Sequence, residues 1–121
     1  MEIAYVNIFV SELARSVDFY QQKLGLELEG GDPAHGYASF QLGAVRLGLA
    51  LAGDDAPDLI GRPTGVGLAT SDLAADHKRL EAAGVRFTMP PERQPWGGFM
   101  AMFADPDGNT FYLDEISAAH G

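Results

Sequence analysis

The chain has 121 residues, no cysteine and a formal net charge of -9, from 8 basic and 17 acidic residues. The lack of cysteine excludes disulfides, thiolate catalysis and zinc sites with Cys ligands. The acidic balance argues against nucleic acid and anionic membranes as partners, although a solvated acidic surface that favours solubility explains it equally simply. The length suits one globular domain.

No segment has the length of a membrane span. The longest apolar stretch, residues 44–52, is interrupted by Arg46 and is too short to cross a bilayer. The N-terminal residues already have a strand pattern in place of a basic leader followed by an apolar segment. We therefore expect a soluble protein with a cytoplasmic location.

The first half of the chain predicts one strand, one helix and three further strands. Residues 3–10 alternate as a strand, Ser11 is expected to cap the helix that follows, and Gly25 is expected to stop it. The further strands are expected at Leu26–Glu29, at Tyr37–Leu42 and at Val45–Leu51, with a break at Gly30-Gly31-Asp32-Pro33.

The second half repeats the first after about sixty residues. Ser11-Glu12-Leu13 has its counterpart in Ser71-Asp72-Leu73, which opens a helix that is expected to stop at Gly84. Strands are expected at Gly65–Thr70, Val85–Thr88, Phe99–Ala104 and Asn109–Ile116. This predicts a single domain with a first βαβββ module at 1–52, a linker at 53–64 and a second module at 65–121, and halves this small must pack together to bury a core.

Several motifs together resemble one superfamily. They are Val10-Ser11-Glu12-Leu13, Phe19-Tyr20, Leu24-Gly25 and, in the second half, Asp105-Pro106-Asp107-Gly108-Asn109. In order and spacing they are similar to the vicinal oxygen chelate superfamily, which includes glyoxalase I, extradiol dioxygenases and bleomycin resistance proteins. The resemblance implies an α+β fold in which two tandem βαβββ modules form an open cup-shaped sheet, commonly in a homodimer.

The resemblance also implies where a metal would be held. Its four ligand positions fall on Tyr5, Gly48, Gly65 and Tyr112 of this chain. Glycine has no side-chain donor and a phenol is a poor ligand for a hard divalent ion, so no metal and no other cofactor is expected. The three histidines have no ligand spacing, and His77 is expected to pack on the apolar face of its helix.

Period-two alternation selects the residues that would line the hollow between the modules. The predicted ligand-binding residues are Tyr5, Asn7, Phe9, Arg46, Gly48, Gly65, Trp96, Tyr112 and Asp114. Trp96 either stacks on a bound ring or covers the core or a dimer seam. Arg46 either pairs with Asp114 or a ligand anion, or faces solvent. Asp105 and Asp107 are expected to form a turn, and Glu115 to be solvated at an edge.

The leading hypothesis is a metal-free binding protein similar to the bleomycin resistance proteins. It would sequester an antibiotic-like molecule, favouring a cationic aromatic one, between the subunits of a homodimer and without catalytic residues. The alternative is a superfamily enzyme, a lyase, isomerase or dioxygenase, that uses an atypical metal site or acid-base chemistry through Tyr5, Asn7 and Tyr112. A third hypothesis is a dimeric scaffold or ligand sensor.

Overall fold

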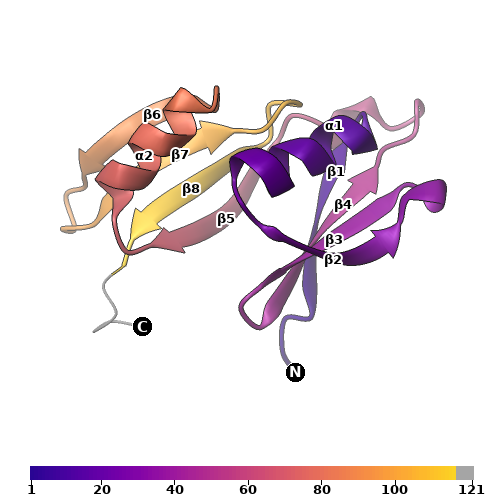
Figure 1. Cartoon of the computed structure of the whole chain (residues 1–121), viewed down its shortest axis with the longest axis horizontal. Coiled ribbons are helices and arrows are strands. Elements are labelled where there is room, and N and C mark those ends of the chain that lie inside the picture. Colours follow the sequence, from indigo (N-terminus) through magenta and orange to yellow (C-terminus); the bar gives the residue numbers. More distant parts are fainter. Residues whose placement is uncertain (117–121) are drawn as a thin grey trace. The chain divides into compact units, whose positions relative to one another are not determined.

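A computed structural model describes residues 1–116 and contains two copies of a βαβββ unit (Figure 1). The first unit consists of β1 (Tyr5–Val10), α1 (Leu13–Asp18) with a π-helical turn η1 (Phe19–Lys23), β2 (Glu27–Asp32), a 3-10 turn η2 (Pro33–His35), β3 (Tyr37–Leu42) and β4 (Val45–Leu51). After a 3-10 turn η3 (Pro57–Leu59), the second consists of β5 (Pro63–Thr70), α2 (Leu73–Ala82), β6 (Arg86–Arg93), β7 (Phe99–Ala104) and β8 (Thr110–Glu115).

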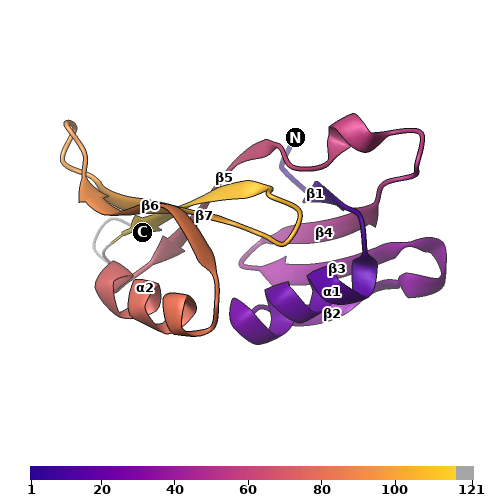
Figure 2. The same ribbon diagram turned by 90° about the horizontal axis from the view of Figure 1, so that it is seen from above.

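Each unit forms its own four-stranded mixed sheet. The strand orders are β1-β4-β3-β2 and β5-β8-β7-β6, and in both sheets the first strand pairs in parallel with the last while the other pairs are antiparallel. The compact units are Met1–Arg62 and the chain from Pro63 onward. Figure 2 shows that each helix lies against one face of its own sheet. The predicted α+β fold with two tandem modules is confirmed.

The core of the first unit lies between α1 with η1 and one face of its sheet. Tyr20 is fully buried, and its ring contacts Phe19 and Phe40 with centroids 5.2 and 6.0 Å apart. The buried strand residues with large or apolar side chains are Ile8, Val10, Ala38, Phe40, Leu47 and Leu49. They alternate along their strands, so this face of the sheet is the one that the hydrophobic pattern of the sequence selects.

The core of the second unit repeats this arrangement under α2. Phe103 and Phe111 are fully buried and stack with centroids 5.4 Å apart. Phe87 contacts Phe103, and the ring of His77 meets Phe87 edge-on with centroids 4.6 Å apart. His77 therefore packs on the inner face of its helix, as predicted from its place on the apolar stripe.

The two helices begin differently, and the predicted cap of the first is wrong. The residue at the N-cap of α1 is Glu12, which makes no side-chain capping bond. Ser11 Oγ instead accepts a hydrogen bond from Arg15 Nη2 at 3.0 Å. Gly25 and Gly84 follow the two helices with φ of 76° and 89°, which confirms them as the residues that stop each helix.

The start of α2 is held by two carboxylates. Asp72 Oδ1 accepts a hydrogen bond from the backbone N–H of Ala75, and Glu115 Oε1 accepts one from that of Leu73, both at 3.1 Å. The expectation that Glu115 is merely solvated is therefore wrong, because it satisfies one of the free N–H groups at the helix start.

Three strands are longer than the sequence predicts. One of them, β5, begins at Pro63, two residues before its expected start. The glycines of 30–31 do not break β2, which continues to Asp32 with a register shift between Leu28 and Gly30. Likewise β6 runs to Arg93 through two prolines, with register shifts between Phe87 and Glu92. Both β2 and β6 are edge strands, where bulges and prolines cost little because one backbone edge has no strand partner.

In the described residues, no helix is long and apolar enough to cross a membrane.

Candidate functional site

The strand register of the first sheet sorts its residues onto two faces. One face packs against α1, and we call the other the helix-free face. It carries alternate residues of three neighbouring strands: Tyr5, Asn7 and Phe9 of β1, Arg46, Gly48 and Ala50 of β4, and Tyr37, Ser39 and Gln41 of β3. The five ligand-binding residues predicted in the first half of the chain therefore share one surface. Their role in binding stays a prediction.

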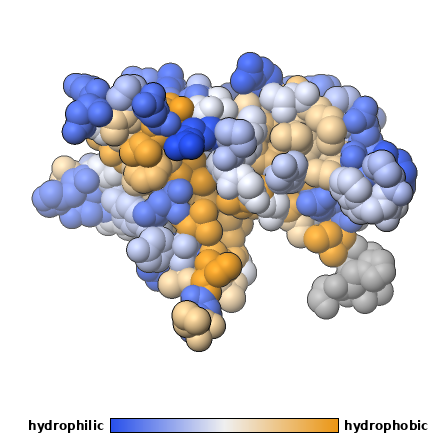
Figure 3. Space-filling model, turned by 180° about the vertical axis from the view of Figure 1, so that it is seen from behind, coloured by the Kyte–Doolittle hydropathy of each residue, from blue (hydrophilic) through white to orange (hydrophobic). Residues whose placement is uncertain are grey.

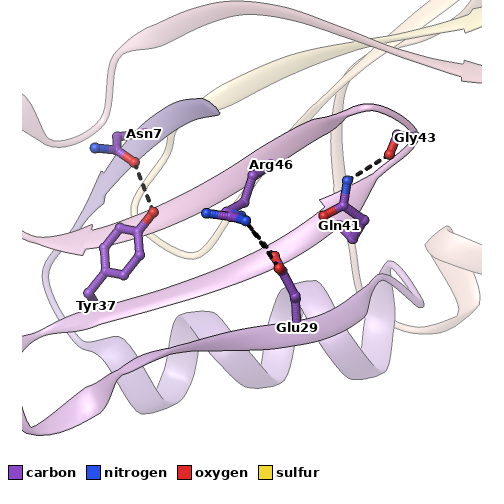
Figure 4. A network of polar contacts seen from close by, with 6 residues as sticks. All are labelled: Asn7, Glu29, Tyr37, Gln41, Gly43 and Arg46. Atoms are coloured by element: carbon purple, nitrogen blue, oxygen red, sulfur yellow. Dashed lines mark hydrogen bonds and ion pairs between the residues drawn. The ribbon is translucent and has the colours of Figure 1, made fainter. Parts of the chain in front are cut away.

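Asn7 and Tyr37 meet above Gly48 on this surface (Figure 4). The Tyr37 hydroxyl donates a hydrogen bond to Asn7 Oδ1 at 3.5 Å, which is long for an O–H···O bond. A Cβ atom on residue 48 would overlap Asn7 Oδ1 and lie only 2.5 Å from Tyr37 Oη. Gly48 is thus required for the close approach of these two side chains, which come from strands on either side of β4.

An ion pair lies further along the same strands. Arg46 Nε is 2.9 Å from Glu29 Oε2, and Arg46 Nη2 donates to Glu29 Oε1 at 3.2 Å (Figure 4). The partner of Arg46 within its own module is therefore Glu29, which no local sequence pattern indicated. Two contacts between a guanidinium and one carboxylate fix both side chains and neutralise the charge of Arg46 locally.

The second sheet has a helix-free face of different character. Tyr112 and Asp114 of β8 lie opposite Gly67 and Ala69 of β5. Asp114 Oδ2 is 3.3 Å from the position of a Cβ atom on Gly67, so its side chain lies over the glycine. Gly65 has a φ of 70° and belongs to the stretch of β5 where the register shifts. On the other side of β8, Met100 and Met102 pair with Asp114 and Tyr112.

Trp96 occupies the tip of the β6–β7 hairpin. The turn is closed by backbone hydrogen bonds between Gln94 and Gly98 and between Gly97 and Gln94. The indole is 73% exposed, so the suggestion that Trp96 covers the core is wrong. It remains available for a bound ring or for a second molecule.

The predicted turn residue Asp105 accepts three hydrogen bonds with its side chain. It is buried, and its Oδ1 accepts hydrogen bonds from the N–H groups of Asp107 and Asn109 at 3.0 and 2.9 Å. Its Oδ2 accepts a third from the Asn109 side chain at 2.9 Å. This confirms the structural role of Asp105 in the turn between β7 and β8.

Two polar residues of the first helix-free face, Tyr37 and Glu29, were missed. The sequence does indicate the orientation of Tyr37, because polar and apolar residues alternate from Tyr37 to Leu42. This alternation places Tyr37 on the face of the sheet that does not carry the buried Phe40. No such pattern indicates the orientation of Glu29, because the irregular register of β2 between Leu28 and Gly30 decides which way it faces.

Part of the surface near β1 is apolar. Figure 3 views the molecule from behind and shows orange surface beside the N-terminal segment. Ile3, which precedes β1, and Tyr5, the first residue of β1, are both exposed. Apolar groups that are left uncovered on an edge strand are typical of surfaces that contact another molecule.

A comparison with known families identifies the chain. Residues 2–113 match the model of the Glyoxalase/Bleomycin resistance protein/Dioxygenase superfamily. The chain belongs to this superfamily. A relative from Shewanella frigidimarina (strain NCIMB 400), an uncharacterized protein, is 27% identical over 127 residues, which cover 95% of this chain and 93% of the relative.

Solved structures of the superfamily include two similar proteins at 32% identity. A member from Sphaerobacter thermophilus DSM 20745 has a TM-score of 0.80, with 94% of this chain and 96% of that one covered. TnmS3 from Streptomyces sp. CB03234, described as an antibiotic binding protein, has a TM-score of 0.77, with 94% of both chains covered. The duplicated fold is thus shared over nearly the whole length.

The four positions to which the resemblance assigns a metal hold two glycines and two tyrosines. Gly48 and Gly65 supply no donor atom, and the space that a side chain on residue 48 would need is taken by Asn7 and Tyr37. Within residues 1–116, no three or more His, Cys, Asp or Glu side chains gather in a group that would hold a metal. The polar groups of the first helix-free face are instead side-chain amides, hydroxyls and a neutralised ion pair, which suit hydrogen bonding to an organic molecule.

Proposed function

We propose that the chain binds and sequesters a small organic molecule without a metal and without changing it chemically. The observation that carries this proposal is the 32% identity to TnmS3, described as an antibiotic binding protein, over 94% of both chains. The chemistry of the metal positions supports it, because two glycines and two tyrosines are a poor ligand set. Binding needs only a suitable surface, and the helix-free faces provide polar groups among aromatic and small residues.

The proposed ligand is a flat aromatic molecule that carries a positive charge. The net charge of -9 raises the local concentration of cations around the protein. The exposed Trp96 offers an indole face, which attracts both rings and cations. Within the first module, Tyr5 and Phe9 on the helix-free face offer aromatic surface of their own.

A homodimer in the cytoplasm completes the proposal. The exposed side chains of Ile3, which precedes β1, and of Tyr5 at its start support a contact with a second copy of the chain. Sedimentation velocity over a range of protein concentrations measures this state directly. A monomer at all concentrations would remove the dimer from the proposal and leave ligand binding untouched.

The decisive experiment is thermal unfolding in the presence of single compounds. The panel consists of bleomycin, doxorubicin and the chlorides of Mn²⁺, Ni²⁺ and Zn²⁺. An antibiotic at about 100 times its Kd adds about 2.7 kcal/mol to the free energy of unfolding, which raises the Tm by several degrees. We expect stabilisation by at least one antibiotic and by none of the metals.

A Trp96→Ala variant assigns the role of the indole in the same assay. Loss of a stacking contact removes about 1–3 kcal/mol of binding free energy. The Kd of the stabilising antibiotic should therefore rise by about 5- to 150-fold. The Tm without ligand should stay within about 2 °C of the Tm of the unchanged protein, since Trp96 is 73% exposed.

In the panel of single compounds, stabilisation by a metal alone would contradict the proposal and favour the enzyme alternative.

A further inference from the structure

Asn7 and Tyr37 are two uncharged hydrogen-bonding groups that face each other on the helix-free face of the first sheet. They come from β1 and β3, which are separated by β4, and they meet only because residue 48 has no side chain. At 3.5 Å their mutual hydrogen bond is at the weak end of the range. A ligand group that bonds both residues at ordinary distances therefore competes easily with it.

The charged residues around this pair are already paired with partners. Among the residues of β1, β3 and β4 on this face, Arg46 is the one with a formal charge, and Glu29 neutralises it at 2.9 Å. On β2, Asp32 lies opposite Tyr37, and its Oδ2 is 2.6 Å from His35 Nδ1. A charged ligand group at the pair would lose water and find these side chains already paired, which costs free energy. A neutral polar group would lose less and regain its hydrogen bonds.

The pair also has complementary hydrogen-bonding capacity. The Asn7 side chain has two N–H donors besides the oxygen that accepts from Tyr37, and the Tyr37 hydroxyl both donates and accepts. A carbonyl oxygen can accept from the Asn7 amide while a neighbouring N–H donates to Tyr37 Oη. A carboxamide has these two groups side by side. An aromatic ring attached to the carboxamide would pack on Ala50. Phe9 of β1 and Tyr37 of β3 lie on either side of Ala50.

We infer that Asn7 and Tyr37, held together over Gly48, form a recognition point for a neutral carboxamide-type group on an aromatic ligand. This inference rests on the proposed function and adds the chemical group that the first module selects. The positive charge proposed for the ligand then belongs to another part of the same molecule. Gly48 has a positioning role, because it leaves room for both side chains.

Three fragments of equal shape and different charge test this inference. They are benzamide, benzamidinium and benzoate, titrated into the ¹⁵N-labelled protein while the side-chain amide signals are followed by NMR. We expect benzamide to shift the Asn7 amide signals in a saturable way, with a Kd at least threefold below those of the two ions. A lower Kd for benzamidinium at Asn7 would overturn neutral recognition, and so would a lower Kd for benzoate.

Variants separate a direct role from a structural one. Benzamide binding to the variants is followed by the backbone N–H signal of Gly48, because Asn7→Leu has no side-chain amide at residue 7. Asn7→Leu keeps the approximate size of the side chain and should abolish the saturable shift, whereas Tyr37→Phe removes one hydrogen bond and should raise the Kd about fivefold. Gln41→Leu is the matched control, since Gln41 lies on the same face but bonds the carbonyl of Gly43 at 2.7 Å (Figure 4). Its benzamide Kd should not change. Unchanged benzamide binding in both Asn7→Leu and Tyr37→Phe would overturn the inference.

The experiment distinguishes failure of the inference from failure of the proposed function. If bleomycin or doxorubicin stabilises the protein but benzamide does not affect Asn7, the recognition point is wrong and small-molecule binding stands. If no antibiotic stabilises the protein and no fragment gives saturable shifts anywhere, the proposed function and the inference both fail.

Discussion

The two modules share a fold and a buried core, but their helix-free faces distribute bulk in opposite ways. In the first module the edge strand β1 carries Tyr5, Asn7 and Phe9, while its neighbour β4 carries the small Gly48 and Ala50. In the second module the edge strand β5 carries Gly67 and Ala69, while its neighbour β8 carries Tyr112 and Asp114. In the first module the glycine of the pair Asn7–Gly48 lies on the inner strand β4. In the second module the glycine of the pair Gly67–Tyr112 lies on the edge strand β5.

This difference shows which part of the duplicated unit is free to change. The core faces must bury apolar side chains under a helix in both modules, so Phe40 and Leu49 have counterparts such as Phe103 and Leu113. The helix-free faces do not contribute to that burial. They have diverged until the first pairs an amide with a phenol over a glycine, whereas the second places a carboxylate over one. Selectivity for a ligand belongs on such faces.

The turns that join the last two strands of each module provide the largest expected contrast. Asp105→Ala removes a buried carboxylate that accepts three hydrogen bonds, so we expect the free energy of unfolding to fall by about 2–4 kcal/mol. The matching change in the first module is Gln41→Ala, which removes one exposed side-chain bond and should cost about 0.5 kcal/mol or less. Urea denaturation measures both, and equal losses would contradict this account of the turns.

The two glycines of the helix-free faces provide the second contrast. Gly48→Ala forces Asn7 and Tyr37 apart, and we expect it to lower the free energy of unfolding by about 1–2 kcal/mol. Gly67→Ala meets only the end of Asp114 at 3.3 Å, so the loss of backbone freedom in the unfolded chain should make it neutral or slightly stabilising. The double variant Asn7→Ala/Gly48→Ala should be less destabilised than the sum of its single changes. Strict additivity would show that the two residues do not compete for space.

The helix starts provide the smallest contrast. Asp72→Ala removes the bond to the Ala75 N–H and should cost about 1 kcal/mol, while Glu12→Ala removes no cap and should change the stability by about 0.5 kcal/mol or less. Both values follow from urea denaturation of the full chain. A larger loss for Glu12→Ala would indicate that the exposed ion pair between Glu12 and Arg15 matters more than such pairs usually do.

The elements were predictable because their signals are local. Gly25 and Gly84 stop the helices, β3, β4 and β7 have the predicted bounds, and Asp105 forms the predicted turn. The errors fall where tertiary contacts override local preference. Prolines and glycines remain within β6 and β2 because both are edge strands with shifted register. The cap of α2 includes Glu115 from the last strand, 42 residues away from Leu73.

The amino-acid sequence by itself determined the duplication, the α+β class, the superfamily resemblance and the lack of donors at two metal positions, because each depends on residue type and spacing alone. Only the tertiary structure decided that Tyr37 reaches across β4 to Asn7, that Glu29 neutralises Arg46 and that Trp96 is exposed. The physical reason is that strand order and register are set by pairing between distant segments. They bring together residues that are 30 positions apart, and the missing side chain of Gly48 leaves the room for them to meet.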